Sequence, residues 1–215
     1  MLINIHRIGA LASLSCAATF IFGFVLLLTQ LMPYIEQKDN PAVAVKFVLE
    51  NHGILSLWNF VIYIVFGVLL TILIIALYRR LPPVNSVISQ LALVFGAVWV
   101  TMVIGSGMIA NLGLTRVVEM ANAHPSLAQS LWLSVITIKE GLSGSNELIG
   151  GLWVTLVSIV MWKARVYKRS MVFTGLMAGA AGIASTVPLF GALGAVFGIV
   201  LIAWFVYLSI EMICE

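Results

Sequence analysis

The feature that most constrains this chain is a series of six apolar stretches, each long enough to cross a lipid bilayer as a helix. A helix rises about 1.5 Å per residue, so about 20 apolar residues span the roughly 30 Å hydrocarbon layer. The stretches predict spans over residues 8–31, 53–78, 87–111, 144–162, 171–187 and 191–213. We therefore predict an all-α, polytopic membrane protein, with residues 1–215 forming a single domain of six transmembrane helices.

The composition supports this fold class and excludes others. Of the 215 residues, 62% are hydrophobic and 9% are charged, which leaves too few polar side chains to cover a water-exposed surface. The net charge of +3 rests on eleven basic residues that lie between apolar stretches, so we expect no nucleic-acid partner. The two cysteines, Cys16 and Cys214, predict neither a disulfide framework nor a metal finger.

Lysine and arginine in the loops predict the orientation of the helices. If six helices alternate, seven basic residues fall on one side and three on the other. The larger group is Arg7, Arg79, Arg80, Lys163, Arg165, Lys168 and Arg169, and the smaller group is Lys38, Lys46 and Arg116. The eleventh basic residue, Lys139, lies at the outer surface near the start of the fourth span. Both termini are therefore predicted to be cytoplasmic. We interpret the basic block 163–169 as an anchor at anionic headgroups, with docking of a cytosolic partner as the alternative.

The first outer loop is predicted to contain a short helix over residues 41–51. Asn40 can cap a helix N-terminus, and Pro41 suits the first helical position, where its missing N–H costs nothing. The following apolar residues form one stripe at helical spacing: Ala44, Val45, Val48 and Leu49. This pattern is typical of a helix that lies in the outer membrane interface.

The connection between the third and fourth spans is predicted to be an outward helical hairpin over residues 112–140. No proline occurs from 87 to 122, and a single helix of that length would reach about 54 Å. His124 and Pro125 end it, and Ser126 with Gln129 matches a capping box that would start the next helix. The sequence equally allows a third span that ends near residue 108, with residues 127–138 lying along the interface.

Small residues at four-residue spacing predict where helices pack closely. Three such sets occur: Gly9, Ser13 and Ala17; Gly175 and Gly179; Gly194 and Gly198. Because residues 178–185 are nearly all small, we predict that the fifth span is the packed centre of the bundle. Pro188 is expected to end that helix.

A polar segment leads into the fourth span and supplies the candidate site. On a helix, residues 140, 143 and 147 share one face, and residues 139, 143 and 146 share its neighbour. Counted from Lys163, position 147 lies roughly 24 Å into the layer, and the amides at positions 59 and 111 reach a similar height. We predict an outward-facing vestibule for a small ligand or an ion, lined by Glu147, Asn146, Glu140, Ser143, Asn59 and Asn111.

Each of these residues also has a structural interpretation. A carboxylate at that depth costs up to a few kcal/mol unless it faces a cavity or a partner. Glu147 could instead pair with Lys139 or Arg116 and hold helices together, and the amides could hydrogen-bond across helices. Both interpretations stay open at this point.

Enzymatic, metal and cofactor functions find little support in the sequence. His6, His52 and His124 all lie near span ends, so no histidine pair can hold haem within the bilayer, and we expect no cofactor and no metal. The sole aspartate, Asp39, lies in an outer loop, so no Ser-His-Asp set is predicted. We therefore predict no catalytic residues.

The segment Gly144-Ser-Asn-Glu-Leu-Ile-Gly-Gly-Leu-Trp153 gives the chain a family resemblance. Together with the six-span plan, the inner turn Tyr78-Arg-Arg-Leu-Pro-Pro83 and the long outward connection, it resembles a family of small bacterial membrane proteins classed as a domain of unknown function. The resemblance implies a location in the bacterial cytoplasmic membrane and supplies no mechanism.

Two functions from different classes follow from these observations. The first is ligand or ion handling through the vestibule, with a small molecule or a lipid as the bound species. The second is an interaction or sensory subunit without transport, which would use the apolar stretch 127–138 to bind a membrane partner or a second copy of the chain.

Overall fold

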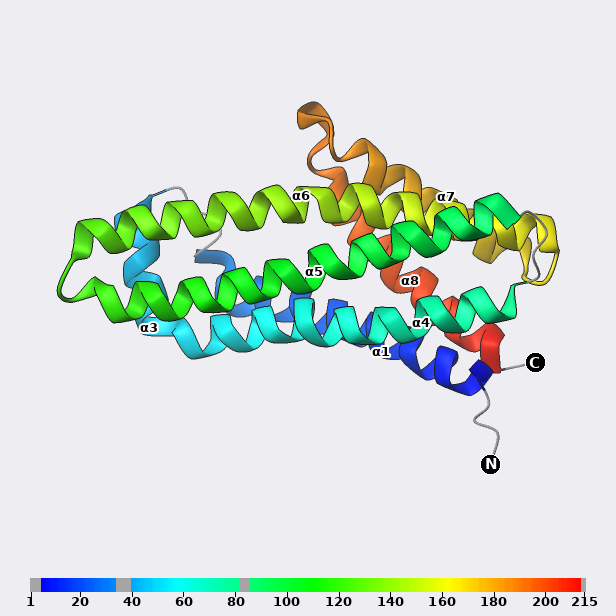
Figure 1. The fold of residues 1–215 in the computed structure, drawn as a ribbon, viewed down its shortest axis with the longest axis horizontal. Helices are drawn as coiled ribbons and strands as arrows, with labels where there is room; N and C mark the ends of the chain where they lie inside the picture. Colours follow the sequence, from blue (N-terminus) through cyan, green and yellow to red (C-terminus); the bar gives the residue numbers. More distant parts are fainter. Residues whose placement is uncertain (1–4, 34–39, 82–85, 214–215) are drawn as a thin grey trace.

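The computed structural model describes residues 5–33, 40–81 and 86–213, and it describes their side chains except at residues 86 and 143–146. Every regular element within these ranges is a helix (Figure 1). The first half of the chain contains α1 (Ile5–Leu26), a π-helical segment η1 (Leu27–Leu31), α3 (Pro41–Asn59), a second π-helical segment η2 (Phe60–Val65) and α4 (Phe66–Arg80). The second half contains α5 (Ser86–Ala121), α6 (Pro125–Ala164), α7 (Arg169–Ala184), the 3-10 turn η3 (Pro188–Phe190) and α8 (Leu193–Ile213).

The longest elements, α5 and α6, form a hairpin that runs the length of the molecule (Figure 1). They contain 36 and 40 residues, so they measure roughly 54 Å and 60 Å, well beyond a 30 Å hydrocarbon layer. Of the two sequence-based alternatives, the structure has the continuous hairpin, and residues 127–138 are part of α6. The capping-box prediction is wrong, because α6 already begins at Pro125 with His124 as its N-cap, and Ser126 lies inside its first turn.

The predicted outer helix is present, although it packs against protein. The Asn40 side chain accepts a hydrogen bond from the Val43 N–H at 3.4 Å, and Pro41 is the first helical residue, as predicted. At Asn51 the backbone leaves helical geometry (φ −128°, ψ 17°), and the resulting kink separates the first part of α3 from the rest of the helix. The predicted apolar stripe of that part packs into a second core with the far ends of α5 and α6.

The main core lies in the other half of the molecule and is built around aromatic rings. Trp99, Trp153 and Trp204, from α5, α6 and α8, are fully buried and contact one another in series, at 5.5 and 5.9 Å between ring centroids. Phe66 and Phe205 extend this cluster toward α4 and α1. The three tryptophans lie deep in the bundle.

The position of α7 differs from the prediction that it forms the centre of the bundle. It packs against α6 and α8 and stands at the edge of the molecule (Figure 1). Its small residues face α6: a β-carbon built on Gly179 would contact the hydroxyl of Thr155 and lie 2.8 Å from the carbonyl oxygen of Gly151. Its opposite face exposes Phe173 and Met177. Pro188 follows the end of α7, as predicted.

Within the described residues, five helical stretches are long and apolar enough to cross a membrane. They are formed by α1 with η1, by α3 through α4, by α5, by α6 and by α8. The remaining predicted span, residues 171–187, corresponds to α7, which has only 16 residues. The chain is therefore a multi-pass helical bundle of the membrane-protein class.

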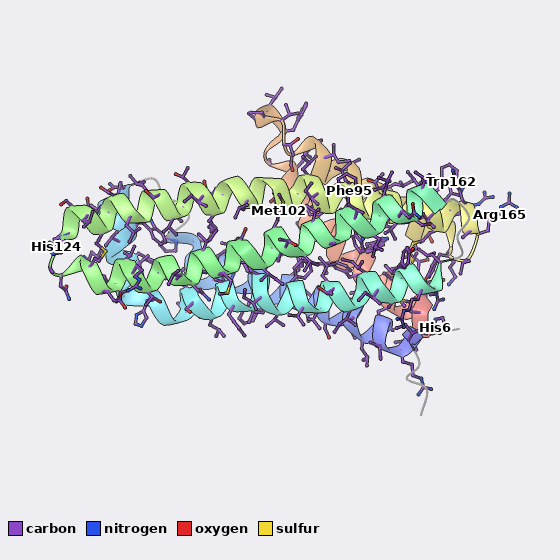
Figure 2. All side chains as sticks on the ribbon, in the orientation of Figure 1. His6, Phe95, Met102, His124, Trp162 and Arg165 are labelled. Carbon is purple, nitrogen blue, oxygen red and sulfur yellow. The ribbon has the colours of Figure 1, made fainter. Side chains whose placement is uncertain are left out.

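Basic and aromatic residues gather where the N-terminal end of α1, the C-terminal ends of α4 and α8, and the α6–α7 turn meet. Arg80 donates a hydrogen bond to Nδ1 of His6 at 2.8 Å, and its guanidinium carbon lies 5.1 Å from the centre of the Tyr167 ring. Lys168 forms an ion pair with Glu211 at 2.8 Å. Figure 2 shows His6, Trp162 and Arg165 at this end of the molecule and His124 at the opposite end. We call this region the basic end.

Burial changes the acidity of one group at the basic end. Tyr167 lies in the α6–α7 turn with 7% of its surface exposed. Burial disfavours the phenolate and raises the pKa of Tyr167 to about 12, with Arg80 opposing that shift and Glu211 adding to it.

Candidate ligand-binding cavity

A cavity of about 370 Å³ lies between α1, η2, α5, α6 and α8. Counted along the helices from the basic end, its lining residues lie roughly 18–32 Å away, so the cavity would occupy the far half of a 30 Å layer. Its volume falls at the lower end of the 300–1,000 Å³ that is typical of small-molecule sites. Most of its wall is apolar or aromatic.

Glu147 is the single charged residue among the described residues that line this cavity. α6 carries it one turn before Gly150 and Gly151, where the helix packs closely against neighbours. A β-carbon built on Gly194 of α8 would lie 3.8 Å from Oε1 of Glu147, so the carboxylate faces α8 where that helix has no side chain. Among the described side chains, none forms a hydrogen bond or ion pair with this carboxylate. Glu147 is thus half-buried against an apolar cavity, and no described side chain serves as its counter-ion.

Aromatic rings from six helical segments surround the same space. They are Phe20 and Phe24 of α1, Trp58 of α3, Tyr63 of η2, Phe66 of α4, Trp99 of α5 and Phe197 of α8. The indole N–H of Trp58 donates to the carbonyl oxygen of Gly23 at 3.0 Å, which fixes this ring between α3 and α1. The faces of such rings carry partial negative charge, which favours bound cations.

Both π-helical segments in the described part of the chain border the cavity. Leu27 lies at the start of η1, and Ile62 and Tyr63 lie within η2. A π-helical turn holds one residue more than an α-helical turn, at a cost in stability, and such turns are frequent at functional sites. Here they widen α1 and the α3–α4 helix on the side of the cavity.

Among the predicted vestibule residues with described side chains, none shares this cavity with Glu147. Asn59 is buried and lines a separate, much smaller void next to Lys139. The side-chain N–H of Asn111 donates to the carbonyl oxygen of Ser56 at 3.3 Å, which links α5 to α3. Glu140 is exposed. The side chains of Ser143 and Asn146 lie outside the described residues.

The described side chains of the site provide few ligands for a metal ion. Within the described residues, no group of three or more histidine, cysteine, aspartate or glutamate side chains could hold one. A hard divalent cation takes six or more oxygen ligands, whereas this cavity presents one carboxylate. An organic cation needs only one counter-charge together with apolar contact.

The aromatic lining was not found by sequence reasoning. No local sequence pattern joins Trp58 and Trp99, because they lie on different helices. A faint signal existed in the number of aromatic residues near position 60, where Trp58, Phe60, Tyr63 and Phe66 occur within nine residues.

Comparison of the chain with protein-family models, with curated proteins and with solved structures finds no match. The chemistry of the cavity is therefore the basis for a functional assignment.

Proposed function

We propose that this protein is a multi-pass membrane protein that binds a small, lipophilic organic cation in the cavity beside Glu147. The observation that carries the proposal is one carboxylate, without a protein counter-ion, facing an aromatic cavity of about 370 Å³. This narrows the sequence-based hypothesis of ligand or ion handling to one class of ligand.

The physical argument rests on desolvation. An unpaired carboxylate in an apolar site is costly, and a cationic ligand would supply the missing counter-charge. The surrounding rings add cation–π attraction of about 0.5–2 kcal/mol each where a ring face meets the charge. The apolar part of the ligand would fill the rest of the space. A small inorganic cation would lose its hydration shell without gaining replacement oxygen ligands.

Binding of tetraphenylphosphonium to the purified protein in lipid nanodiscs tests this proposal. We expect saturable binding to wild type and at least a tenfold loss of affinity in Glu147→Gln. Glu140→Gln is the matched control, because it removes the same charge from the same helix at an exposed position. Tetraphenylborate has nearly the same shape and the opposite charge, so it should not bind.

Two results would overturn the proposal. Equal affinity of wild type and Glu147→Gln for tetraphenylphosphonium would show that the carboxylate plays no part. Equal binding of the phosphonium and the borate would show that the cavity selects only for apolar character, as a site for a lipid chain would.

For the topology, we propose six spans, with α7 included, and both termini in the cytoplasm of a bacterial cell. The gathering of basic residues at one end supports this orientation through the positive-inside rule, and the bacterial location rests on the family resemblance. The test uses single-cysteine variants in a background without Cys16 and Cys214. A membrane-impermeant maleimide should label His124→Cys in intact cells and should leave Lys163→Cys unlabelled; the reverse pattern would invert the topology.

The alternative function, a non-transporting interaction or sensory subunit, has one observation in its favour. In the stretch 127–138 one face is buried by the protein itself, through Ala128, Trp132 and Ile136. The opposite face leaves Leu127, Leu133 and Ile138 about half exposed. Native mass spectrometry discriminates: an oligomer that Leu133→Glu dissociates would favour this alternative, whereas a monomer would count against it.

A further inference from the structure

A second site lies at the basic end, separate from the aromatic cavity. The turn between α6 and α7 encloses a space of about 390 Å³ lined by Trp162, Arg165, Tyr167, Lys168, Arg169 and Val172. A smaller apolar space of about 160 Å³ adjoins it and shares Trp162, Arg169 and Val172, with Phe173 as its additional wall. Three cationic side chains thus border one compartment, and apolar side chains extend it into the next.

Within the described residues, only one of the three cationic side chains at this turn has an acidic partner. Lys168 is paired with Glu211, at 2.8 Å. Among the described residues, no acidic side chain pairs with Arg165 or Arg169. Two guanidinium groups therefore border a concave space without counter-ions. Guanidinium binds phosphate through two parallel hydrogen bonds, which makes arginine the preferred partner of a phosphodiester.

The backbone at Arg165 is unusual. Arg165 is the C-cap of α6 and has left-handed geometry (φ 56°, ψ 27°), the one non-glycine residue with positive φ among those described. Helix ends of this type usually carry glycine, because a β-carbon is strained there. An arginine at this position accepts strain that glycine would avoid, and its guanidinium lines the cavity.

The apolar compartment distinguishes between classes of anion. Trp162 and Phe173 are each 57% exposed and flank this compartment along the direction of α7. Figure 2 places Trp162 and Arg165 at the same end of the molecule. A free phosphate would make no favourable contact with the apolar wall. A phospholipid would place its headgroup at the arginines and the start of an acyl chain along that wall.

From this arrangement we propose that the α6–α7 turn is a specific binding site for one anionic phospholipid, held by Arg165 and Arg169 at the phosphate and by Trp162, Val172 and Phe173 at the acyl chain. The site does not depend on the function assigned to the aromatic cavity.

The test counts retained lipids by native mass spectrometry of the full-length protein, released from nanodiscs of mixed phosphatidylglycerol and phosphatidylcholine. Wild type should retain one phosphatidylglycerol at least tenfold more often than one phosphatidylcholine. Arg165→Gly with Arg169→Gln should abolish this preference. Glycine adopts the left-handed conformation without strain, so the turn should stay intact.

Arg7→Gln with Arg79→Gln is the matched control, because it removes two exposed arginines from the same end of the molecule. It should keep the preference. Loss of the preference in both double variants would show that general charge attraction is responsible and would overturn the proposal, as would its retention in Arg165→Gly with Arg169→Gln.

A further arm distinguishes a lipid from a soluble anion. Trp162→Ala should weaken retention of long-chain phosphatidylglycerol, since it removes the wall of the acyl compartment and leaves every charge in place. Inorganic phosphate at millimolar concentration should not displace the lipid. Displacement by phosphate together with no effect of Trp162→Ala would identify a site for free anions and would refute the lipid assignment.

Discussion

Replacing Gly151 with alanine tests whether backbone contact between α6 and α7 sets the position of α7. A β-carbon at Gly151 would lie 2.8 Å from the Gly179 carbonyl oxygen, 3.0 Å from the Ile183 nitrogen and 3.2 Å from the Gly182 carbonyl carbon. All three atoms belong to the backbone, so no rotamer change relieves the contact. The shortest distance falls about 0.6 Å below the 3.4 Å at which ordinary contact begins, and α7 must move away by a comparable amount.

The expected cost is that of overpacking a close interface, about 1–3 kcal/mol. Gly105→Ala is the matched control, because a β-carbon there would meet nothing within 4 Å. Both variants gain up to about 1 kcal/mol of helix propensity, so the difference between them isolates the contact. Unfolding in mixed micelles by titration with sodium dodecyl sulfate, followed by circular dichroism, measures this difference. If Gly151→Ala unfolds at the same detergent fraction as Gly105→Ala, the close approach of α6 and α7 does not exist as described.

Three further predictions concern a buried tyrosine, a hydrogen bond between helices and the cavity. Burial raises the pKa of Tyr167 from about 10 to about 12. The contribution of the protonated phenol to stability is therefore complete below pH 10 and is lost as pH rises toward 12. Between pH 9 and pH 11, the free energy of unfolding should fall less in Tyr167→Phe than in wild type. The Ser13 hydroxyl donates to the Phe205 carbonyl oxygen at 2.7 Å, so Ser13→Ala should lower the free energy of unfolding by about 0.5–1 kcal/mol, and no change in detergent titration would show that this bond does not join α1 to α8. Gly194→Leu should weaken tetraphenylphosphonium binding at least tenfold with unfolding unchanged, since a side chain there enters the cavity beside Glu147; unaltered affinity would place the bound cation elsewhere.

Local signals in the sequence predicted local structure well. Asn40 and Pro41 marked the start of α3, and the absence of proline from residue 87 to 122 predicted the length of α5. At the start of α6 two local signals competed. Pro125 supplies a fixed φ and needs no N–H partner, so the helix began there and the capping box at Ser126 was not used. The kink at Asn51 has no clear signal in the sequence.

Long-range arrangement was harder to predict. A run of small residues shows that a helix can approach another closely, but it does not show how many neighbours that helix has. This is why α7 was placed at the centre and is found at the edge. For the candidate site, Glu147 was predicted because a carboxylate in lipid has a high free-energy cost. Its partners in the cavity come from helices that are far apart in the sequence, so equal height along the bundle wrongly grouped it with Asn59.

The shortness of α7 has a consequence for the surrounding lipid. Sixteen residues cover about 24 Å, roughly 6 Å less than a typical hydrocarbon layer. The exposed Val187, Leu189 and Phe190 beyond its end extend the apolar surface and make up part of this hydrophobic mismatch. The helices α5 and α6, by contrast, exceed the layer. In the proposed six-span topology, lipids next to α7 would therefore compress or tilt while those next to α5 would not, so the protein would impose a thickness gradient on its lipid annulus.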